Sequence, residues 1–508
     1  MAYFYGMKHL RDLFPEHPDN PEIRNLCINS QDVKPGDLFI CTKGATTDRH
    51  DFVLSAVKNG AAAVVASRPI DVSVPVVYVN NTNEAMPHLA ATLYEHPENK
   101  MNLTAVTGTN GKTTAATILS EMMGQEWFGY IGTNGVANSI FREPIRNTCP
   151  DADRMYLYLR KLADAGCTSV VLEATSEALL FGRLDTFSFD TVIFTNITQD
   201  HLNTHKTIEN YVKAKLHLLD LLKKDATVIL NADDKYFERE KTAAGEHRII
   251  SYGMAEKADL RIESIECMRA KTILKVTVRG HLAGSAPSKY ETEQNGFALR
   301  PEQTENERIY TIVSPLVGDF NAWNLCAAIC AMLDHGLRME EIISRIAWIR
   351  PIAGRMEELF FGQPYRLVLD YAHTPDAFRH ILPFLKMTKE GRLITLTGSA
   401  GGRDRGKRPE IGRLVTEYSD LVIFTADDPR TEDVNGIIDD LVSESKKRNF
   451  IRIPDRKKAI AEALRMAQAG DTVLVAGKGR DNYMALGEEY IPYSDYETIE
   501  SYFHNCRE

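Results

Sequence analysis

The stretch Thr107-Gly108-Thr109-Asn110-Gly111-Lys112-Thr113-Thr114 decides the fold of this chain. The apolar residues 101–106 before it predict a strand, and residues 115–123 after it predict a helix. A glycine loop between a strand and a helix cradles phosphates, because its backbone N–H groups and the positive end of the helix dipole point at them. We therefore expect a nucleoside triphosphate here, with Lys112 on its β- and γ-phosphates and the Thr113 hydroxyl on Mg²⁺.

This loop departs from the standard phosphate-loop spacing, because Val106 stands where that pattern has its first glycine. The alternative interpretation is a plain glycine turn before a helix. The loop alone indicates ATP or GTP and does not name a reaction.

Length, composition and charge limit the class of protein. The chain has 508 residues, 44% of them hydrophobic, which is enough for about three globular domains. Its net charge of −10 argues against nucleic acid as the main partner, because nucleic-acid binding needs a basic face. The eight cysteines are scattered without a C-x-x-C pair, which is typical of reduced thiols in a cytoplasmic protein. No apolar run approaches the roughly 18 residues of a membrane span, and no signal peptide is expected.

Alternating strand and helix patterns predict an α/β fold of three domains, at residues 1–98, 99–349 and 350–508. Within the first domain we expect a strand at 37–41, a helix at 52–60, a strand at 62–66 and a linker at 96–99. The other two domains should contain a central doubly wound sheet of P-loop type and a C-terminal Rossmann-like sheet. Their buried parallel strands are expected at residues 169–172, 191–194, 227–230, 367–369, 393–396, 421–424 and 472–475. Residues 280–307 are polar and contain Gly and Pro, which predicts a surface insertion.

Several chemically active side chains follow these strands. Glu173 ends one predicted strand, where a second Mg²⁺ ligand would lie beside a phosphate loop, although a surface glutamate is the alternative. Asp200 and His201 follow the next strand, at an edge where α/β sheets bind ligands. Lys215 belongs to Tyr211-Val212-Lys213-Ala214-Lys215, and periodicity alone predicts that it is a solvated helix lysine.

Further polar motifs lie in the last third of the chain, and three of them follow predicted strands. Each one alone could be a turn with exposed charge, but together they predict a second polar site facing the first. The motifs span residues 318–324, 354–357, 370–376, 401–408, 427–430 and 477–481.

In their order and spacing, these motifs resemble the Mur ligase family, most closely its MurE branch, the UDP-N-acetylmuramoyl-tripeptide synthetases of peptidoglycan assembly. The resemblance covers nearly the whole chain, and residues 29–39 are similar to the family's UDP-binding start. It implies that ATP phosphorylates the free D-Glu carboxylate of UDP-MurNAc-L-Ala-D-Glu. The amine of a free amino acid then attacks the acyl phosphate, giving an amide, ADP and phosphate. The family also implies a cytoplasmic enzyme, and we expect a monomer.

The resemblance implies that the first domain binds UDP, the second ATP and the third the amino acid. It also assigns roles to individual residues. Catalysis and Mg²⁺ binding fall to Lys112, Thr113, Glu173, His201 and Lys215, with a CO₂-derived carbamate on Lys215. The nucleotide would contact Gly108, Thr109, Asn110, Gly111, Lys112, Thr113, Thr114, Asn321 (adenine), Arg355 (phosphates) and Asp370 (ribose). UDP-MurNAc-dipeptide would contact Ser30, His50, Thr148, Pro150, Ser176 and Arg183. The incoming amino acid would contact Arg403, Asp427, Asp428, Arg430, Gly477 and Asp481.

The chain departs from the family pattern at three motifs. Where the family has Ser-Ser-His-Ala-Leu, this chain has Glu177 in place of the histidine. In the family's Gly-Lys-Gly-His-Glu, Arg480 and Asp481 replace the last two residues. In the family's Asp-Asn-Pro-Arg, Asp428 replaces the asparagine. Arg430 keeps a planar fork suited to a carboxylate, which favours meso-diaminopimelate over L-lysine as the acceptor. Asp428 would in turn attract a distal ammonium group.

The departures leave other functions open. One alternative is a Mur-like ligase with a different acceptor, and another is a catalytically weak paralogue that binds nucleotide as a regulator. The intact set of Lys112, Thr113, Glu173, His201 and Lys215 argues against the regulator. Folylpolyglutamate synthase shares the ligase core but lacks the UDP-binding domain that residues 1–98 are expected to form.

Overall fold

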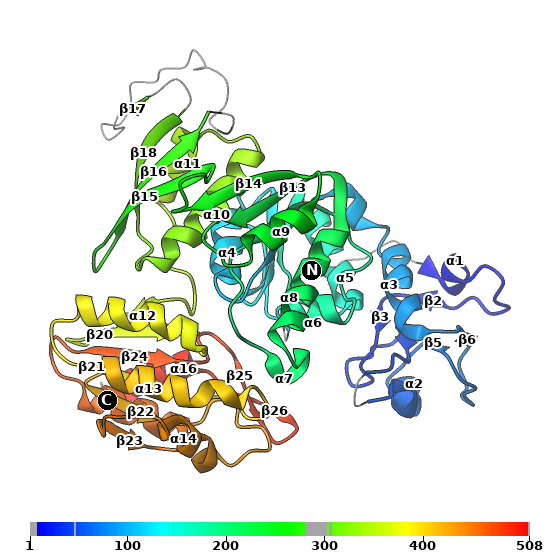
Figure 1. Cartoon of the computed structure of the whole chain (residues 1–508). Helices are drawn as coiled ribbons and strands as arrows, with labels where there is room; N and C mark the ends of the chain where they lie inside the picture. The colour runs from blue at the N-terminus through cyan, green and yellow to red at the C-terminus, as the bar shows by residue number, and fades with distance from the viewer. Residues whose placement is uncertain are drawn as a thin grey trace. The chain divides into compact units, whose positions relative to one another are not determined.

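A computed structural model describes residues 8–44, 47–145, 147–280, 282, 302–303 and 307–505. The chain divides into two compact units, which are treated separately below (Figure 1). The first unit contains Met1–Ala105, Met123–Thr191 and Asp220–Ala226, and the second contains Val106–Met122, Val192–Leu219 and Thr227–Glu508. Strands and helices alternate through both units, so the predicted α/β class is confirmed.

The first unit begins with a parallel four-stranded sheet in the order β3-β4-β5-β6. Phe39 and Val64 are fully buried at its centre, as expected for β-branched and aromatic side chains on a covered sheet. The elements are β1 (Lys8–His9), α1 (Leu10–Leu13), β2 (Glu22–Ile23), β3 (Leu26–Cys27), β4 (Leu38–Ile40), η1 (Arg49–Phe52), α2 (Val53–Lys58), β5 (Ala63–Ala66), β6 (Val76–Tyr78), α3 (Thr82–Leu93) and η2 (Pro97–Lys100). Both predicted strands here are confirmed.

Two local predictions for this region need correction. The helix expected at 52–60 ends at Lys58 and is preceded by the 3₁₀ turn η1, which Asp48 caps by accepting from the His50 N–H. The linker expected at 96–99 contains the 3₁₀ helix η2, because Glu95 and His96 take left-handed backbone angles and Pro97 then starts the new turn.

The rest of the first unit carries an edge of sheet in which β10, β9, β8 and β11 are neighbours. The apolar side of helix α5 is buried through Met155, Leu159 and Leu162, as its strong amphipathicity predicts. The elements are β8 (Phe128–Gly132), β9 (Gly135–Ala137), β10 (Arg142–Glu143), α5 (Ala152–Asp164), β11 (Ser169–Glu173) and α6 (Ser176–Leu180).

Strands β7 (Asn102–Thr107), β12 (Phe189–Phe194) and β13 (Leu222–Asn231) each have residues in both units. In the second unit, β13 pairs in parallel with β14 and β14 with β15, and β16, β18 and β17 then follow as antiparallel neighbours. Its elements before residue 350 are α4 (Lys112–Met123), α7 (Leu202–His205), α8 (Ile208–Leu216), η3 (His217–Leu221), α9 (Phe237–Ala244), β14 (Arg248–Gly253), β15 (Leu260–Cys267), β16 (Thr272–Arg279), β17 (Glu302–Gln303), β18 (Glu307–Ser314), α10 (Phe320–Asp334) and α11 (Met339–Ile346).

Helix α4 begins at Lys112, three residues before the predicted start at Ala115. The reason is that Gly111 turns the chain so sharply that Lys112, Thr113 and Thr114 already form the first helical turn. The N–H groups of a first turn have no partner within the helix, so they are available to a bound anion. Lys112, Thr113 and Thr114 therefore belong both to the phosphate loop and to the first turn of α4.

The C-terminal part of the second unit is a six-stranded sheet with helices on both faces (Figure 1, yellow to red). Its order is β19-β20-β24-β21-β22-β23, parallel except for β19. Alternate side chains face opposite layers: Val368 packs with α12, α13 and α14, while Leu367 and Leu369 pack with α15 and α16. The elements are β19 (Glu357–Leu359), β20 (Arg366–Asp370), α12 (Pro375–Thr388), β21 (Leu393–Thr397), η4 (Arg405–Lys407), α13 (Arg408–Tyr418), β22 (Leu421–Phe424), α14 (Val434–Val442), β23 (Phe450–Arg452), α15 (Arg456–Met466), β24 (Thr472–Ala476), β25 (Tyr483–Leu486), β26 (Glu489–Pro492) and α16 (Asp495–Asn505).

The seven apolar runs predicted as strands are all strands: β11, β12, β13, β20, β21, β22 and β24. Much of the predicted insertion at 280–307, namely residues 281, 283–301 and 304–306, lies outside the described residues. Within the described ranges, no helix has the length and hydropathy needed to cross a bilayer. The domain boundaries at 98/99 and 349/350 stay a prediction.

Candidate functional site

The phosphate loop closes around two glycines that no other residue could replace. Gly108 has φ +147°, and a Cβ there would lie 1.9 Å from the Thr195 Oγ1 atom. Gly111 has φ +86°, and its Cβ would lie 2.1 Å from the Asn324 Oδ1 atom. Positive φ and the lack of space both require glycine. The loop backbone therefore packs directly against the side chains of Thr195 and Asn324.

The residues after strand β12 hold the loop in shape. The Thr109 N–H donates to the Asn196 carbonyl at 2.8 Å, and the Asn110 N–H donates to the Asn196 side chain at 3.0 Å. Thr195 Oγ1 donates back to the Asn110 carbonyl at 2.6 Å. Two segments that are about 85 residues apart thus form one rigid structure, which suits a loop that must present its N–H groups in a fixed array.

Lys112 and Lys215 both donate to carbonyls of this loop. The Lys112 Nζ lies 2.9 Å from the carbonyl oxygens of both Gly108 and Thr109. The Lys215 Nζ lies 2.8 Å from the same Gly108 carbonyl. The predicted phosphate-binding lysine and the predicted modified lysine are therefore neighbours.

Lys215 is not the solvated helix lysine that periodicity predicts. It lies on α8 with only 1% of its surface exposed, and its Nζ is 4.8 Å from the centre of the Tyr211 ring. Burial, followed by repulsion from Lys112, lowers its pKa well below the ordinary lysine value. The amine is therefore far more readily neutral, and a neutral amine is the form that reacts as a nucleophile.

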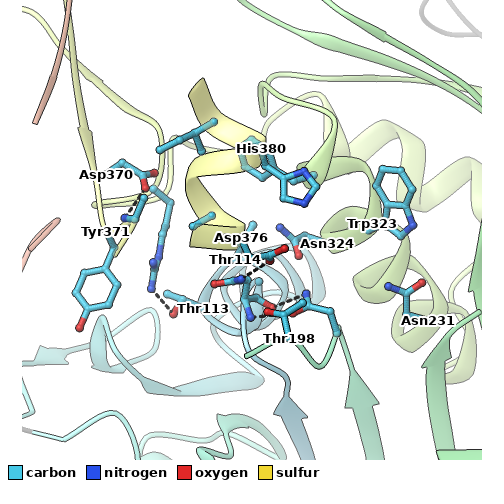
Figure 2. Close-up of a pocket in the computed structure, with 18 of the residues that line it drawn as sticks. Thr113, Thr114, Thr198, Asn231, Trp323, Asn324, Asp370, Tyr371, Asp376 and His380 are labelled. Carbon is cyan, nitrogen blue, oxygen red and sulfur yellow. Dashed lines mark hydrogen bonds between the residues drawn. The ribbon is translucent and has the colours of Figure 1, made fainter. Parts of the chain in front are cut away.

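A pocket of about 320 Å³ opens beside the phosphate loop, within the usual size of a small-molecule site (Figure 2). Figure 2 shows His380 and Asp376 on one side of it and Trp323, Asn324 and Asn231 on another. Its wall consists of Asn110, Gly111, Thr113, Thr114, Asn196, Thr198, Asn231, Asp233, Asp234, Phe320, Trp323, Asn324, Arg355, Asp370, Tyr371, Ala372, His373, Asp376, Ala377, His380 and Ile381. We call it the nucleotide pocket.

The nucleotide pocket combines aromatic surface with fixed polar groups. The Trp323 indole N–H donates to Asp233 at 2.7 Å, which fixes the orientation of the ring. The Asp370 carboxylate accepts from the N–H groups of Met356 and Ala372 at 2.6 and 2.7 Å. An aromatic wall suits a flat base, and a fixed carboxylate suits hydroxyl groups.

The predicted nucleotide residues divide into two groups. Arg355 and Asp370 line the pocket, and the Arg355 guanidinium donates to Thr113 Oγ1 at 3.0 Å. Asn321 is not part of the described wall; its amide donates to the Val317 carbonyl and accepts from Asn324, which does line the pocket. Its contact with adenine stays a prediction, and Asn324 is the asparagine that meets the cavity.

A second, smaller pocket of about 140 Å³ gathers all the residues predicted to bind the incoming amino acid. Arg403, Asp427, Asp428, Arg430, Gly477 and Asp481 all line it, although they come from three separate segments. The rest of its wall is Asp200, His201, Asn203, Tyr371, His373, Ala400, Asp404, Lys407 and Tyr483. We call it the acceptor pocket, and it shares Tyr371 and His373 with the nucleotide pocket.

Charges in the acceptor pocket are largely balanced. The Lys478 Nζ lies 2.8 Å from Asp428 Oδ1, which also accepts from the Ala485 N–H at 2.9 Å. Lys478 also lies 3.6 Å from Asp481, so one ammonium group balances only part of the negative charge here, and the attraction of Asp428 for a distal ammonium stays a prediction. Burial raises the pKa of Asp481 to about 7, against the lowering effect of Lys478. Burial also raises the pKa of Asp427.

Arg430 is the cation best placed for a ligand in this pocket. Its backbone is left-handed, with φ 53°, and is held by hydrogen bonds to Ala485 and Gly487. Its Nε atom is buried and has no hydrogen-bond partner among the residues that the structure describes. A buried guanidinium donor without a partner is costly, so this fork is suited to an incoming carboxylate.

Asp200 is the centre of a cationic group between the two pockets. Lys407 Nζ lies 3.4 Å from Asp200 Oδ1, and the imidazoles of His201 and His373 lie 3.4 and 3.9 Å from its other oxygen. Burial alone would raise the pKa of Asp200, but Lys407 and the two histidines hold it well below its ordinary value. Burial and Lys407 lower the pKa of His373 to about 3, so this imidazole is neutral at pH 7.

The first unit contains a separate cavity of about 900 Å³, large enough for an extended ligand. Its wall includes predicted Pro150, together with cationic Lys34, Arg49, Arg154 and Lys161. Ser30 and His50 are buried, and within the described wall it is their neighbours Asn29, Gln31 and Arg49 that face the cavity. Both ring nitrogens of His50 already have partners: Nδ1 lies against the Asp48 carboxylate, and Nε2 accepts from the Ser67 N–H.

The other predicted substrate residues are fixed by contacts within the first unit. Thr148 Oγ1 lies 3.1 Å from Thr133 Oγ1, and Arg183 pairs with Asp151 at 2.7 Å. Ser176 is buried at the start of α6. Each side chain is held in one orientation, and its contact with substrate stays a prediction.

Glu173 is a buried carboxylate with organised partners. It accepts from the Tyr130 hydroxyl at 2.6 Å and from the Thr133 N–H at 2.9 Å. The described residues hold no cluster of three or more His, Cys, Asp or Glu side chains able to bind a metal. In the predicted Mg²⁺ set, Thr113 and Glu173 offer hard oxygen donors, whereas His201 offers an imidazole nitrogen and an amine at Lys215 does not fit. A carbamate at Lys215 would fit it.

Sequence reasoning missed several residues of the nucleotide pocket, above all Trp323 and Asp233. Trp323 lies inside the motif at residues 318–324, so its place next to Asn324 on a helix start was a usable signal. Asp233 gave no signal, because a short turn after β13 brings it to the pocket.

Known proteins match this chain along nearly its whole length. Three family profiles match consecutive stretches: "Mur ligase family, catalytic domain" at residues 22–98, "Mur ligase middle domain" at 106–332, and "Mur ligase, glutamate ligase domain" at 354–479. A protein of Bacillus cereus named UDP-N-acetylmuramoyl-L-alanyl-D-glutamate--2,6-diaminopimelate ligase is 37% identical over 495 residues, covering 95% of both chains. A relative of the same name from Geobacillus kaustophilus is 35% identical and covers 96% of both.

Solved structures agree with these relatives. A structure titled as a UDP-N-acetylmuramoyl-L-alanyl-D-glutamate--2,6-diaminopimelate ligase has a TM-score of 0.60 and 26% identity, and covers 99% of this chain and 100% of that one. The full-length identity to the two named relatives and the three consecutive profiles establish that the chain belongs to the Mur ligase family.

Proposed function

We propose that this protein is an ATP-dependent ligase that joins 2,6-diaminopimelate to the D-Glu carboxylate of UDP-N-acetylmuramoyl-L-alanyl-D-glutamate. The observation that carries the proposal is the acceptor pocket, in which every residue predicted for the incoming amino acid lies together. This pocket shares a wall with the nucleotide pocket, so an activated carboxyl group and an amine could meet at Tyr371 and His373. Relatives named for this same reaction support the substrate assignment.

The nucleotide pocket would bind ATP. Backbone N–H groups of the phosphate loop and Lys112 would neutralise the phosphates, and the Trp323 ring would cover the base. A Mur ligase structure from Thermotoga maritima, titled as a complex with ADP, has the same fold, with a TM-score of 0.66 and 19% identity. Lys112 now donates to loop carbonyls, so it must turn toward the phosphates when ATP binds.

The reaction joins two anionic partners, so cations must dominate the reacting centre. Arg355, Lys407 and Arg403 line the two pockets, and Lys112 lies on the phosphate loop beside them. Bound Mg²⁺ would supply further positive charge and polarise the phosphates. His373 is neutral at pH 7 and faces both pockets. A pKa of about 3 makes this imidazole a weak base, so it would accept a hydrogen bond from the acceptor ammonium and orient it rather than remove its proton.

Lys215 supports the proposed carbamate. Its depressed pKa provides the neutral amine that CO₂ requires, and the product carries a carboxylate in place of a cation. That change converts repulsion with Lys112 into attraction. It also adds a hard oxygen ligand to the Thr113 hydroxyl and the Glu173 carboxylate of the predicted Mg²⁺ set.

Diaminopimelate is favoured over L-lysine because Arg430 presents an unpartnered donor, and only diaminopimelate has a distal carboxylate to accept from it. We further propose a cytoplasmic monomer with the three domains 1–98, 99–349 and 350–508, in keeping with a reaction that consumes ATP and a UDP-linked precursor.

The test is phosphate release by the purified protein with ATP, Mg²⁺, bicarbonate and UDP-N-acetylmuramoyl-L-alanyl-D-glutamate. Meso-diaminopimelate, L-lysine and L-ornithine are added separately, and the product is identified by mass spectrometry. We expect a tripeptide product with meso-diaminopimelate. Turnover only with another amino acid would favour a paralogue with a different acceptor. ATP binding without turnover on any of them would favour a regulatory role.

A further inference from the structure

Tyr371 forms the partition between the nucleotide and acceptor pockets. Its ring stacks under the Arg355 guanidinium at 4.5 Å, on the nucleotide side. On the acceptor side, the negative charge of Asp481 raises the pKa of the Tyr371 hydroxyl, and both residues line the acceptor pocket. A displacement of this ring would therefore change the shape of both pockets.

The backbone around Tyr371 is closely packed against two glycine-containing segments. The Tyr371 N–H donates to the Gly354 carbonyl at 3.0 Å. Gly354 in turn lies against Gly479 and Arg480: a Cβ on Gly354 would lie 2.8 Å from the Arg480 nitrogen. Gly479 presses on Tyr371 itself, where an added Cβ would lie 3.2 Å from the Tyr371 Cβ. Segments 354–357 and 477–481 thus touch through glycines, without intervening side chains.

One ion pair ties these two segments together. The Arg480 Nε donates to Glu357 at 2.9 Å, and its Nη2 donates to the other carboxylate oxygen. Glu357 also accepts from the Gly354 N–H at 2.8 Å. The Arg480 guanidinium lies 3.6 Å from the centre of the Tyr496 ring, and the side chains of Glu357 and Arg480 are 12% and 32% exposed. A two-pronged, stacked and half-buried pair is the kind that holds a fixed geometry.

Each end of this pair is one or two residues from a ligand-binding group. Glu357 follows Arg355, which reaches Thr113 of the phosphate loop. Arg480 precedes Asp481, a wall residue of the acceptor pocket. Neither Arg480 nor Glu357 is part of the described wall of either pocket.

We propose that Arg480 and Glu357 are positioning residues that couple the two pockets, so that bound nucleotide organises the loop that receives the amino acid. The inference rests on the proposed function for the identity of the two ligands. When ATP draws Arg355 to its phosphates, segment 354–357 shifts, and the ion pair carries the shift to residues 477–481. Asp481 and Gly477 then adopt the geometry that binds the acceptor. By reciprocity, the acceptor tightens nucleotide binding by the same factor.

The test is a double-mutant cycle with Arg480→Met, Glu357→Gln and the double variant, measured by acceptor KM, kcat and thermal stability. Each single variant should raise the KM for meso-diaminopimelate about tenfold with little change in kcat, and the double variant should be no worse than either single one. Arg480→Lys keeps the charge without the planar fork and should recover only part of the effect. A conservative Arg480→His variant, which carries the residue usual in the family, should behave like Arg480→Lys or worse, because it cannot reach both carboxylate oxygens.

Arg392→Met is the matched control. Arg392 donates through Nε and Nη2 to one oxygen of Asp471, at the opposite end of the same sheet and away from both pockets. It should lower thermal stability without changing the acceptor KM. If Arg480→Met changes stability as this control does and leaves the acceptor KM unchanged, the pair is only structural and the proposal is wrong. Additive effects in the double variant would also contradict it.

A binding measurement separates this proposal from the proposed function. The affinity for a non-hydrolysable ATP analogue is measured with and without meso-diaminopimelate, in the wild-type protein and in Arg480→Met. We expect the acceptor to tighten analogue binding several-fold in the wild type and not in the variant. Absence of wild-type turnover would overturn the proposed function, whereas turnover with equal enhancement in both proteins would overturn the coupling alone.

Discussion

The loop end of the nucleotide pocket comes from one short stretch, in which Asn110, Gly111, Thr113 and Thr114 line the cavity. The acceptor pocket instead takes its wall from segments spread between Asp200 and Tyr483. The first relies on backbone N–H groups and glycines, whose positions follow from local chain geometry. The second relies on charged side chains that must be balanced against one another, as Lys478 is against Asp428. A backbone site tolerates side-chain changes around it, and a side-chain site is sensitive to each of its members.

This difference predicts that acceptor residues act on one substrate only, while residues at the loop affect the whole reaction. The predictions below test it, beginning with the largest effect.

Lys215→Ala should reduce kcat by on the order of 10³-fold, because it removes the group that supports both the loop and the proposed Mg²⁺ site. Acetate or another short carboxylic acid should restore part of the activity by occupying the place of the carbamate. The measurement is phosphate release at saturating substrates, with and without the acid. Lys213→Ala, on the exposed side of the same helix, is the control and should keep wild-type activity. Full activity in Lys215→Ala would rule out the carbamate.

Arg430→Lys should raise the KM for meso-diaminopimelate by on the order of 30-fold, because lysine cannot donate two parallel hydrogen bonds to a carboxylate. The KM values for ATP and for the UDP-linked substrate should change less than twofold. Steady-state kinetics with each substrate varied in turn provide the measurement, and Arg413→Lys on the surface of α13 is the control. An equal rise in all three KM values would mean that Arg430 holds the fold rather than the acceptor.

Trp323→Leu should raise the KM for ATP about fivefold, since a leucine retains apolar contact but loses the flat stacking surface. The acceptor KM should not change, whereas in Arg430→Lys the acceptor KM changes and the ATP KM changes little. Trp348, which is 85% exposed, offers a matched control as Trp348→Leu. A larger effect on the acceptor than on ATP would show that the two pockets are not separable in this way.

Asp481→Asn should change how stability depends on pH. Burial raises the pKa of Asp481 from an ordinary value of 3.8 to about 7, so the folded protein keeps its proton between these values while the unfolded chain loses it. Stability is therefore lost as pH rises from about 4 to about 7. Asparagine does not titrate, so the variant avoids this loss. The difference in melting temperature between variant and wild type should therefore change by on the order of 2 °C in favour of the variant from pH 5 to pH 8.

Thermal melts at a series of pH values measure that difference. Asp439→Asn, which changes an exposed carboxylate on α14, should show no such trend. A constant offset between Asp481→Asn and wild type across the range would mean that the Asp481 pKa is not raised in the folded protein.

The sequence by itself determined the elements and the phosphate loop. Seven apolar runs became strands because residues buried on both faces leave an unbroken hydrophobic pattern, and the glycines at 108 and 111 marked positive φ angles. The motifs also indicated which residues would meet in the acceptor pocket, because parallel strands end at one edge of a sheet.

Only the tertiary structure decided the environment of each side chain. Periodicity placed Lys215 in solvent, but the loop carbonyl of Gly108 and the Tyr211 ring enclose it. The motif that contains Asp428 gave no sign of the Lys478 ammonium 2.8 Å from it, and Asp233, about 90 positions from Trp323, fixes the orientation of that ring. Burial and the balance of charge depend on contacts between distant segments, and a local pattern of residues contains no record of those contacts.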